Sequence, residues 1–428
     1  MVIKLLISVS LLVFLSTIKA QQSTEARSTG MAFSNSAATQ GIEHFGLNPA
    51  TLALPVKFGF EFNLLSANAT IRNNSFNKGQ YDRYFTKGDT LSQGDKDDIL
   101  SSVPSEGLRV DGLARVNSIG IYMKYFSFSV FGIGASFAKV PGDIPVLIFE
   151  GNNEEGRVYQ VGDFDGDGWG GVGIQVSGAY PIYKGYDPET NLIALGGTFK
   201  YIGGLGTFKV ISAEGQIKNY AAEENQFYAV IDQKLEARTA EGGSGVGFDF
   251  GAIAKLNEKW SAGLTIINLF GKISWSKNTE MHTYSIVSDT FSVSSDLIET
   301  PDEIIVTMDS SYSIEPFSST LPAVLDMGVA YRANQYFLLT AEYEQGLSES
   351  LVGSKRSRIA FGMEFTQIPV LPLRAGLSFG GRIGTSLALG FGIDLKNWIL
   401  DLAYMGHGGI FPSSAKGLTL AVTTRLRF

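Results

Sequence analysis

The sequence predicts an all-β protein, a transmembrane antiparallel β-barrel of about fourteen strands, with about sixteen as the alternative. Three observations carry this prediction. Gly (50), Phe (29) and Tyr (17) recur from one end of the chain to the other. After residue 20, no apolar stretch reaches the roughly 18 residues that a spanning helix needs. Segments of about ten residues alternate between apolar and polar side chains, which is the length at which a tilted strand crosses a bilayer.

Residues 1–20 are predicted to be an export signal that is not part of the folded protein. Lys4 supplies a positive charge, the run from Leu5 to Leu15 is apolar, and Ala20 precedes the expected cleavage site. An N-terminal membrane helix is the less favoured alternative, because the run is short and a polar stretch follows it. Residues 21–55 then form an N-terminal segment and residues 56–428 form the barrel.

The alternation is clearest near the C-terminus. One face of the last predicted strand carries Leu418, Leu420, Val422, Leu426 and Phe428, and the other carries Thr419, Ala421, Thr423, Arg425 and Arg427. The same period runs through residues 325–331, 337–343, 359–365, 373–379, 385–395 and 398–404. A soluble sandwich also alternates, but here the second face is rich in small residues and in charges of both signs, as a filled polar lumen would be. Closure follows because an open sheet edge in lipid leaves backbone groups unpaired.

The connections agree with this topology. Short turns at 257–259, 334–335 and 396–397 alternate with long polar stretches at 71–107, 139–168, 204–244 and 271–320, which are expected outside the cell. Residues 206–238 are the one ambiguous stretch, since an additional strand pair there would raise the count to about sixteen. The first strand is expected at residues 56–71.

Charged side chains on the predicted inner face form the largest candidate set. Ion pairs between strands, or between wall and N-terminal segment, are the favoured role, and a path for an ionic substrate is the alternative. The set is Asp249, Lys255, Asp326, Arg332, Glu342, Glu344, Arg358, Glu364, Arg374, Asp394, Asp401, Arg425 and Arg427.

An aspartate-rich stretch is the only candidate metal site. Asp163, Asp165 and Asp167, followed by Gly168, have the opening spacing of an EF-hand calcium loop. Position 12 would be Ile174 in place of the bidentate acid, so a polar loop running into a strand explains the stretch equally well. Calcium is the one cofactor considered.

Composition narrows the function classes. The absence of cysteine excludes disulfides, thiolate metal sites and a lipidated cysteine, and the net charge of −8 argues against nucleic acid as a partner. We do not expect an enzyme. His44, His282 and His407 are scattered along the chain, and no Gly-x-Ser-x-Gly nucleophile elbow is present.

The N-terminal segment carries a resemblance. The stretches with Ala26, Arg27, Gly30 and Met31 and with Asn48, Pro49 and Ala50 resemble the mature N-terminus of the FadL-type barrel superfamily, including its PorV-like members in Bacteroidota. The resemblance implies fourteen strands with the N-terminal segment folded into the lumen as a plug. A barrel of that width is not filled by its own side chains, which gives such a segment space.

A second stretch points to an uncharacterised family. Residues 245–252, 256–260 and 267–269 are similar to a Bacteroidota outer-membrane family known only as a domain of unknown function. FadL-type members move hydrophobic molecules through the barrel wall, whereas PorV-like members are partners of a secretion machine. Two functions therefore stay open for an outer-membrane protein in contact with lipid. The first is a channel for small hydrophobic molecules, and the second is a partner barrel of a larger outer-membrane assembly.

Overall fold

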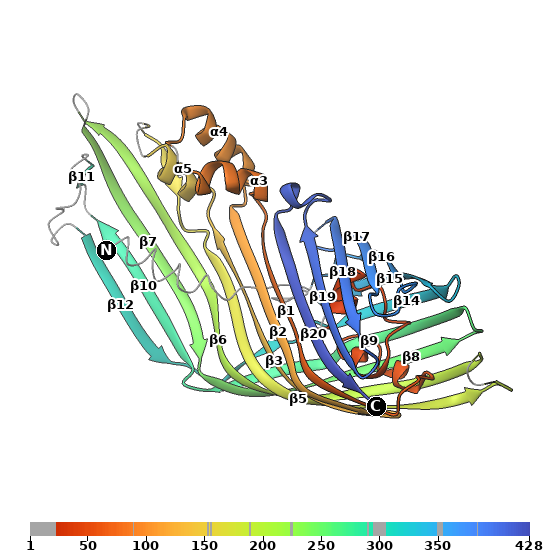
Figure 1. The fold of residues 1–428 in the computed structure, drawn as a ribbon. Coiled ribbons are helices and arrows are strands. Elements are labelled where there is room, and N and C mark those ends of the chain that lie inside the picture. The colour runs from red at the N-terminus through yellow and green to blue at the C-terminus, as the bar shows by residue number, and fades with distance from the viewer. Residues whose placement is uncertain are drawn as a thin grey trace.

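The computed structural model describes residues 23–428 except 89, 152–153, 155, 188–189, 223–225, 289–290, 294–304, 349–353 and 383. Its strands form a single sheet in which β20 (Gly417–Arg427) pairs with β1 (Phe60–Asn73), so the sheet closes on itself (Figure 1). Neighbouring strands pair antiparallel. The predicted fold class is confirmed, while the predicted export signal at 1–20 lies outside the described residues.

Several short strands are parts of one crossing of the wall. The composite crossings are β4 (Val158–Gln160) with β5 (Asp165–Lys184), β7 (Gln226–Ala240) with β8 (Gly242–Lys255), β9 (Trp260–Lys277) with β10 (Glu280–Ser288) and β11 (Phe291–Val293), and β12 (Ile305–Ser313) with β13 (Phe317–Thr320) and β14 (Val324–Arg332). The single crossings, besides β1 and β20, are β2 (Leu108–Met123), β3 (Phe126–Val140), β6 (Leu192–Ala222), β15 (Phe337–Gly346), β16 (Arg358–Phe365), β17 (Leu373–Gly380), β18 (Ser386–Asp394) and β19 (Trp398–His407). The described residues thus make fourteen crossings.

Two sequence predictions need correction. Residues 206–238 add no strand pair, because they belong to the C-terminal part of β6 and to β7. The N-terminal part of β6 pairs with β8, and its C-terminal part pairs with β7, so one strand continues along both. The first strand begins at Phe60 and not at residue 56. Val56 and Phe58 precede it and pack against Ile42 of the N-terminal segment.

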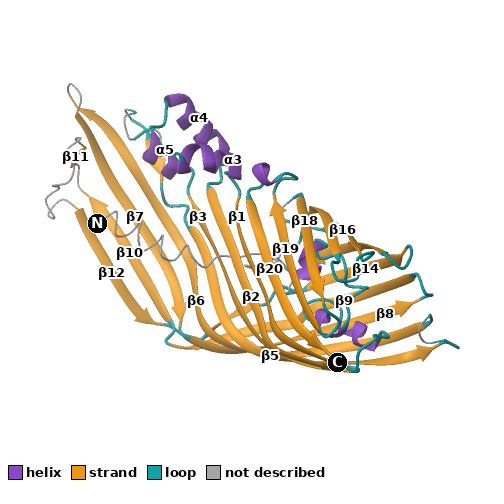
Figure 2. Cartoon of the chain, viewed as in Figure 1, coloured by secondary structure: helices purple, strands orange, loops and turns teal. Residues whose placement is uncertain are grey.

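One side of the barrel is much taller than the other. The ends of β6, β7, β10 and β12 continue past the barrel as a sheet, which we call the extension sheet (Figure 1). Short helices gather at the same end (Figure 2): α3 (Lys78–Tyr81), the π-helical turn η3 (Asp82–Thr86), α4 (Gln93–Ser102), α5 (Asp143–Phe149) and η4 (Pro412–Ser414). The described part of the chain contains no helix that is both long and apolar enough to cross a membrane.

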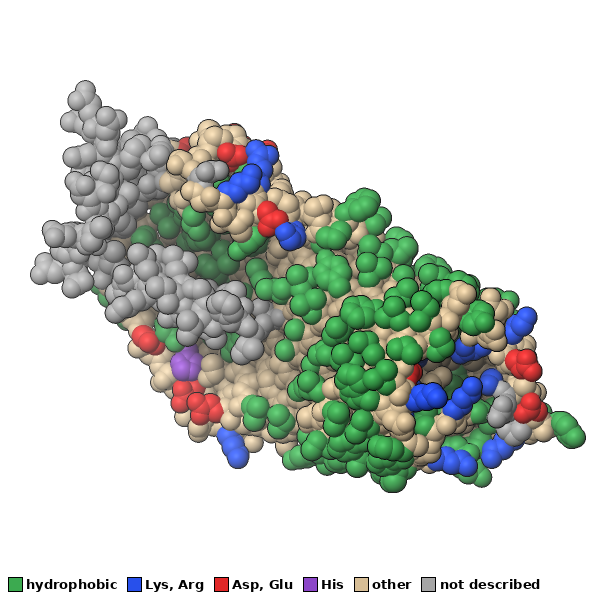
Figure 3. All heavy atoms as spheres, viewed as in Figure 1, with side chains coloured by type: hydrophobic (Ala, Val, Ile, Leu, Met, Phe, Trp, Pro, Cys, Tyr) green, Lys and Arg blue, Asp and Glu red, His purple; other side chains and the backbone are tan. Residues whose placement is uncertain are grey.

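The outer face of the barrel is apolar. Leu389 (52% exposed), Phe361 (50%) and Leu420 (55%) point outward, while their neighbours Ala388, Ala360 and Thr419 are buried. Figure 3 shows a broad apolar surface over the barrel, with charged side chains mainly toward its ends. Such a surface is suited to lipid contact.

The N-terminal segment, residues 23–53, lies inside the barrel, as predicted. It folds into α2 (Ala26–Gly30), η1 (Gly41–His44) and η2 (Pro49–Ala53). Almost all of its residues are buried, including many with small or polar side chains. Small residues let the backbone of the segment approach the wall closely, and the charged residues Glu25, Arg27 and Glu43 pair with charges of the wall or of the segment itself.

Candidate functional site

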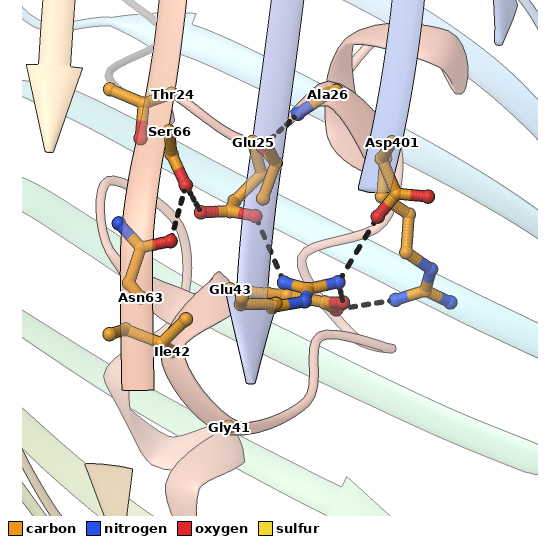
Figure 4. A network of polar contacts seen from close by, with 12 residues as sticks. Thr24, Glu25, Ala26, Gly41, Ile42, Glu43, Asn63, Ser66 and Asp401 are labelled. Atoms are coloured by element: carbon orange, nitrogen blue, oxygen red, sulfur yellow. Dashed lines mark hydrogen bonds and ion pairs between the residues drawn. The ribbon is translucent and has the colours of Figure 1, made fainter. Parts of the chain in front are cut away.

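A network of ion pairs fixes the N-terminal segment to the wall. Figure 4 shows three of its carboxylates, those of Glu25, Glu43 and Asp401, close together. Arg425 on β20 pairs with all three. Its Nη1 lies 3.0 Å from Glu25 Oε2, its Nη2 lies 2.6 Å from Glu43 Oε1, and its Nε lies 3.3 Å from Glu61 Oε1. Glu25 and Glu43 belong to the segment and Glu61 to β1. One guanidinium therefore joins the segment to both edges of the closing seam.

Arg27 makes the second link from the segment. Its Nε and Nη2 donate to the two carboxylate oxygens of Glu364 at 2.7 and 2.8 Å, and its Nη1 lies 2.6 Å from Glu43 Oε2. Arg374 then bridges Glu364 (2.7 Å) to Asp401 (2.6 Å), which also lies 3.3 Å from Arg425. Bidentate, charge-assisted contacts of this kind are strong and directional. We call this set the charge network: Glu25, Arg27, Glu43, Glu61, Glu364, Arg374, Asp401, Arg425 and Arg427.

The other predicted inward charges lie in several environments. Asp249 pairs with Lys200 at 2.8 Å, and Glu344 pairs with Arg358 at 3.1 Å. Asp326 and Glu342 are buried, and Glu342 accepts a hydrogen bond from the backbone N–H of Ser36 at 3.3 Å. Lys255 and Asp394 are half-buried at the ends of strands, and Arg332 is exposed at the end of β14. Arg427, a half-buried member of the charge network, pairs with Glu61 at 2.7 Å.

The Asn-Pro-Ala stretch docks η2 onto the wall. Asn48 caps η2 by accepting a hydrogen bond from the N–H of Ala50 (3.0 Å), and its side-chain amide donates to Ala252 O in β8 (2.9 Å). Gly196 in β6 allows this approach, since a Cβ there would lie 2.5 Å from Ala50 N. Pro49 occupies the first helical turn, where its missing N–H costs nothing.

The first predicted stretch docks in the same way. The N–H of Ala26 donates to Thr423 Oγ1 at 3.0 Å. Gly30 packs against the backbone of Gly390, and Met31 lies against Gly376. The two resembling stretches are therefore both contact points between segment and wall.

The wall itself is interrupted beside the segment. The β1–β2 pairing omits Leu64, Leu65, Ser118 and Ile119, and Leu64 and Ile119 point outward, 44% and 50% exposed. Asn63 spans the interruption by donating to Asn117 O at 3.0 Å, and Asn117 in turn donates to Thr24 Oγ1 of the segment at 2.8 Å. Bulges break the alternation on both strands, which is why a strict two-residue period did not reveal them.

Above the segment, the lumen becomes apolar. Inward side chains of β2, β3, β5, β6, β7 and β9, with Leu321, pack together. They are Leu113, Ala135, Phe137, Trp169, Ile202, Ala240, Ile273, Trp275 and Leu321, which we call the apolar lumen cluster. Trp275 is fully buried, and its indole N–H donates to Ser319 Oγ at 2.9 Å. Ile273 and Trp275 were not expected in the lumen, because residues 271–320 were predicted to form an outer loop.

A second irregularity lies next to this cluster. Asn268 (φ 52°) and Phe270 (φ 56°) in β9 leave the regular strand conformation. Asn268 is held by Asp249, by Lys200 (3.0 Å) and, through its side-chain amide, by Pro322 O (3.0 Å). Lys200 and Asn268 are polar residues of the lumen that the sequence analysis did not single out.

The aspartate-rich stretch does not form an EF-hand loop. Asp165 and Asp167 lie in β5 with Lys139 and Phe137 of β3 as register partners, so the backbone is extended where an EF-hand loop would curl. Asp167 pairs with Lys209 at 3.4 Å. Within the described ranges, no three His, Cys, Asp or Glu side chains come together to hold a metal ion. The alternating aspartates are one polar face of a strand.

Comparison with protein families identifies the chain at the level of family. A family described as being of unknown function, DUF5723, matches residues 49–242 and 238–397. The chain belongs to this family. No protein in a search of curated proteins matches it.

Solved structures show what fold this DUF5723 member shares. The toluene transporter TodX of P. putida has a TM-score of 0.54 and 13% identity, over 95% of this chain and 99% of that one. The toluene transporter TbuX of Ralstonia pickettii has a TM-score of 0.52 and 12% identity, over 95% and 99%. A FadL homologue of Pseudomonas aeruginosa has a TM-score of 0.50 and 11% identity, over 97% and 99%. The FadL-type barrel fold predicted from the N-terminal stretches is therefore confirmed.

Proposed function

We propose that the protein is an outer-membrane channel for small hydrophobic molecules. The apolar lumen cluster is the observation that carries this proposal. The cluster is formed by inward side chains of the wall with Leu321, whereas the apolar clusters around the docked segment are formed between the segment and the wall. Three solved barrels of similar fold are described as toluene transporters or, for CymD, as a monoaromatic hydrocarbon channel.

The contacts support a continuous apolar route. Phe131 packs against the cluster and is the register partner of Asn117, the last paired residue of β2 before the wall interruption. Ile42 and Phe45 of the segment pack with Tyr122 on the other side of the interruption. A hydrophobic molecule that enters from outside would leave water at the cluster, where burial of apolar surface is favourable. The charge network holds the N-terminal segment in the lumen, where the segment blocks the path toward the periplasm.

A substitution inside the cluster tests the proposal. Radiolabelled toluene uptake is measured in Gram-negative cells that carry the full chain in their outer membrane. Trp275→Asp places a carboxylate among apolar side chains, and uptake above the level of cells without the protein is expected to fall at least about tenfold, or about 1.4 kcal/mol. Trp275→Phe keeps the surface apolar and is the matched control, with uptake near wild type. Equal uptake by both variants would contradict a channel that runs through the cluster.

A second candidate is a partner barrel in an outer-membrane assembly, as the PorV-like, Bacteroidota resemblance implies. Apolar side chains on the outer helices favour it: Tyr81 is 55% exposed, Phe85 42% and Ile148 63%. Exposed apolar groups that gather outside the lipid band mark protein contact sites. Native mass spectrometry of the gently extracted protein separates the two functions, because a channel is expected with a small bound molecule and a partner barrel with bound protein.

A further inference from the structure

Strand β12 (Ile305–Ser313) is an open edge of the extension sheet. Its pairing is with β10, and no other strand of the described chain pairs with it. Figure 1 shows β12 at the outermost side of the extension, beyond the barrel. Every residue from Val306 to Ser313 is exposed. The strand therefore presents a row of backbone groups to its surroundings.

The direction of those backbone groups follows from one hydrogen bond. Ile314 N–H donates to Thr279 O at 2.9 Å, and the register of β12 with β10 continues from this pair without a shift. In an antiparallel ladder, the N–H and C=O of one residue point to the same side, and successive residues alternate. The backbone N–H and C=O groups that face β10 are therefore those of Val306, Met308, Ser310 and Tyr312. The open edge is formed by the N–H and C=O groups of Thr307, Asp309, Ser311 and Ser313.

This edge lacks the usual protection against pairing. Exposed edge strands are normally kept apart by lysine, proline, a bulge or an inward charge. Residues 305–313 contain one charged residue, Asp309, and neither lysine nor proline. One face carries Val306 (51% exposed), Met308 (61%) and Tyr312 (58%), while the other carries Thr307, Asp309 and Ser311. A long edge with one apolar face and a single charge is a template for another strand.

We propose that β12 pairs antiparallel with β12 of a second copy of this chain. The register that places Ser310 opposite the second copy's Ser310 makes the two edges complementary. Met308 of each copy then lies opposite Tyr312 of the other, and Val306 lies opposite Ile314. By symmetry each pair occurs twice, and all of these side chains are on one face of the sheet. On the other face, Asp309 meets Ser311, so the two aspartates are not opposite each other. Shifting the register to centre on Asp309 would bring the like charges together.

The symmetry of this contact fixes how the two barrels are placed. Two antiparallel edges in one continuous sheet are related by a two-fold axis perpendicular to that sheet. Because the extension sheet continues the barrel wall (Figure 1), this axis lies roughly along the membrane plane. The second copy is then inverted, with its extension pointing toward the first. The contact joins barrels in two membranes that face each other, and it is separate from transport through the lumen.

The oligomeric state of the full chain in detergent micelles tests the pairing. Sedimentation velocity over a range of concentrations is expected to show a monomer–dimer equilibrium for wild type. Ser311→Pro removes an N–H that faces the open edge and leaves the β10 ladder intact, so dimer is expected to be lost. Ser311→Ala keeps the N–H and is expected to dimerise as wild type does. Monomer for wild type at all concentrations, or equal dimer for Ser311→Pro, would overturn the proposal.

A cysteine cross-link tests the register without weakening the fold. The chain has no cysteine of its own. Ser310 opposite Ser310 is a non-hydrogen-bonded pair, with Cα atoms about 4.5 Å apart, within the range that a disulfide spans. Ser310→Cys is expected to give a covalent dimer on mild oxidation, while Ser101→Cys, exposed on α4, is expected to stay monomeric. Equal yields from the two variants would rule out the proposed register.

Discussion

The two halves of the lumen are built from opposite chemistry. Around the N-terminal segment, buried carboxylates and guanidiniums meet at hydrogen-bond distances, for example 2.6 Å between Arg425 and Glu43. Around Trp275, in the apolar lumen cluster, inward side chains from several strands make apolar contacts, and the Arg109 guanidinium stacks on the ring of Phe137. Both halves are enclosed by the same alternating strands, so the wall alone does not account for the difference.

The contrast suggests that the charged half of the lumen holds the N-terminal segment and that the apolar half lets a molecule pass. Charge-assisted hydrogen bonds are directional and hold their partners in one geometry, which suits a segment that must stay in place. Apolar contacts are non-directional, which suits a surface along which a molecule moves. Four substitutions probe this contrast, ordered by their expected effect on amide-exchange protection of residues 23–53.

Arg425→Leu has the largest expected effect. The substitution leaves Glu25, Glu43, Glu61 and Asp401 without the cation that they share, and breaking a buried pair from one side typically costs about 3–5 kcal/mol. Amide-exchange protection of residues 23–53 is expected to be lost. The midpoint of urea unfolding of the barrel in micelles is expected to shift to a lower urea concentration. Arg332→Leu, at an exposed strand end, is the control and is expected to behave as wild type. Full protection in Arg425→Leu would mean that the network does not hold the segment.

Gly196→Val is expected to displace η2 alone. A Cβ at Gly196 would lie 2.5 Å from Ala50 N, and overpacking of this kind costs about 1–3 kcal/mol. Exchange is expected to rise at Ala50 and Thr51 while α2 remains protected. The neighbouring Gly197→Val is a matched control, because the atom nearest to its Cβ would be Asp249 O at 3.6 Å, an ordinary van der Waals distance. Similar behaviour of the two valine variants would argue against a close contact at Gly196.

Asn48→Ala removes a cap and one contact with β8. Loss of the cap and of the Ala252 hydrogen bond together is expected to cost about 1 kcal/mol. Exchange at Ala50 and Thr51 is expected to rise about fivefold, and Asn48→Asp, which keeps the capping oxygen, is expected to recover part of the protection. If alanine and aspartate gave the same exchange, the cap would contribute nothing.

Ile273→Ala is expected to leave the segment untouched. The residue is fully buried in the apolar lumen cluster, so the barrel loses about 2–4 kcal/mol of unfolding free energy. Protection of residues 23–53 is nevertheless expected to match wild type within error, because the charge network and the cluster share no strand. Increased exchange in the segment would show that the two halves of the lumen are coupled.

The barrel and its inward charges were predictable because both depend on a local period. Strands β14 to β20 follow the predicted alternation, and Arg374, Asp401 and Arg425 lie buried as the inward face requires. The pairing of Arg425 with Glu25 was not predictable, since it joins residues at opposite ends of the chain. The aspartates at 163–167 misled for a related reason: an i, i+2, i+4 spacing fits both an EF-hand loop and one face of a strand. The strands of the extension sheet were predicted to be loops because they contain more polar residues than the strands of the barrel. Alternation of side chains between two faces is the same in both, so composition alone was misleading.

The charge network also ties filling of the lumen to completion of the wall. Arg425 and Arg427 are on β20, the last strand in the chain, whereas Glu25 and Glu43 are among the first residues described. A nascent sheet without β20 has neither of these cations, so its N-terminal carboxylates would remain in water. The segment can therefore settle only as the final strand reaches β1, and an incompletely assembled barrel stays open. Order of synthesis and order of packing are thus reversed, because an earlier part of the chain is held in place by a later one.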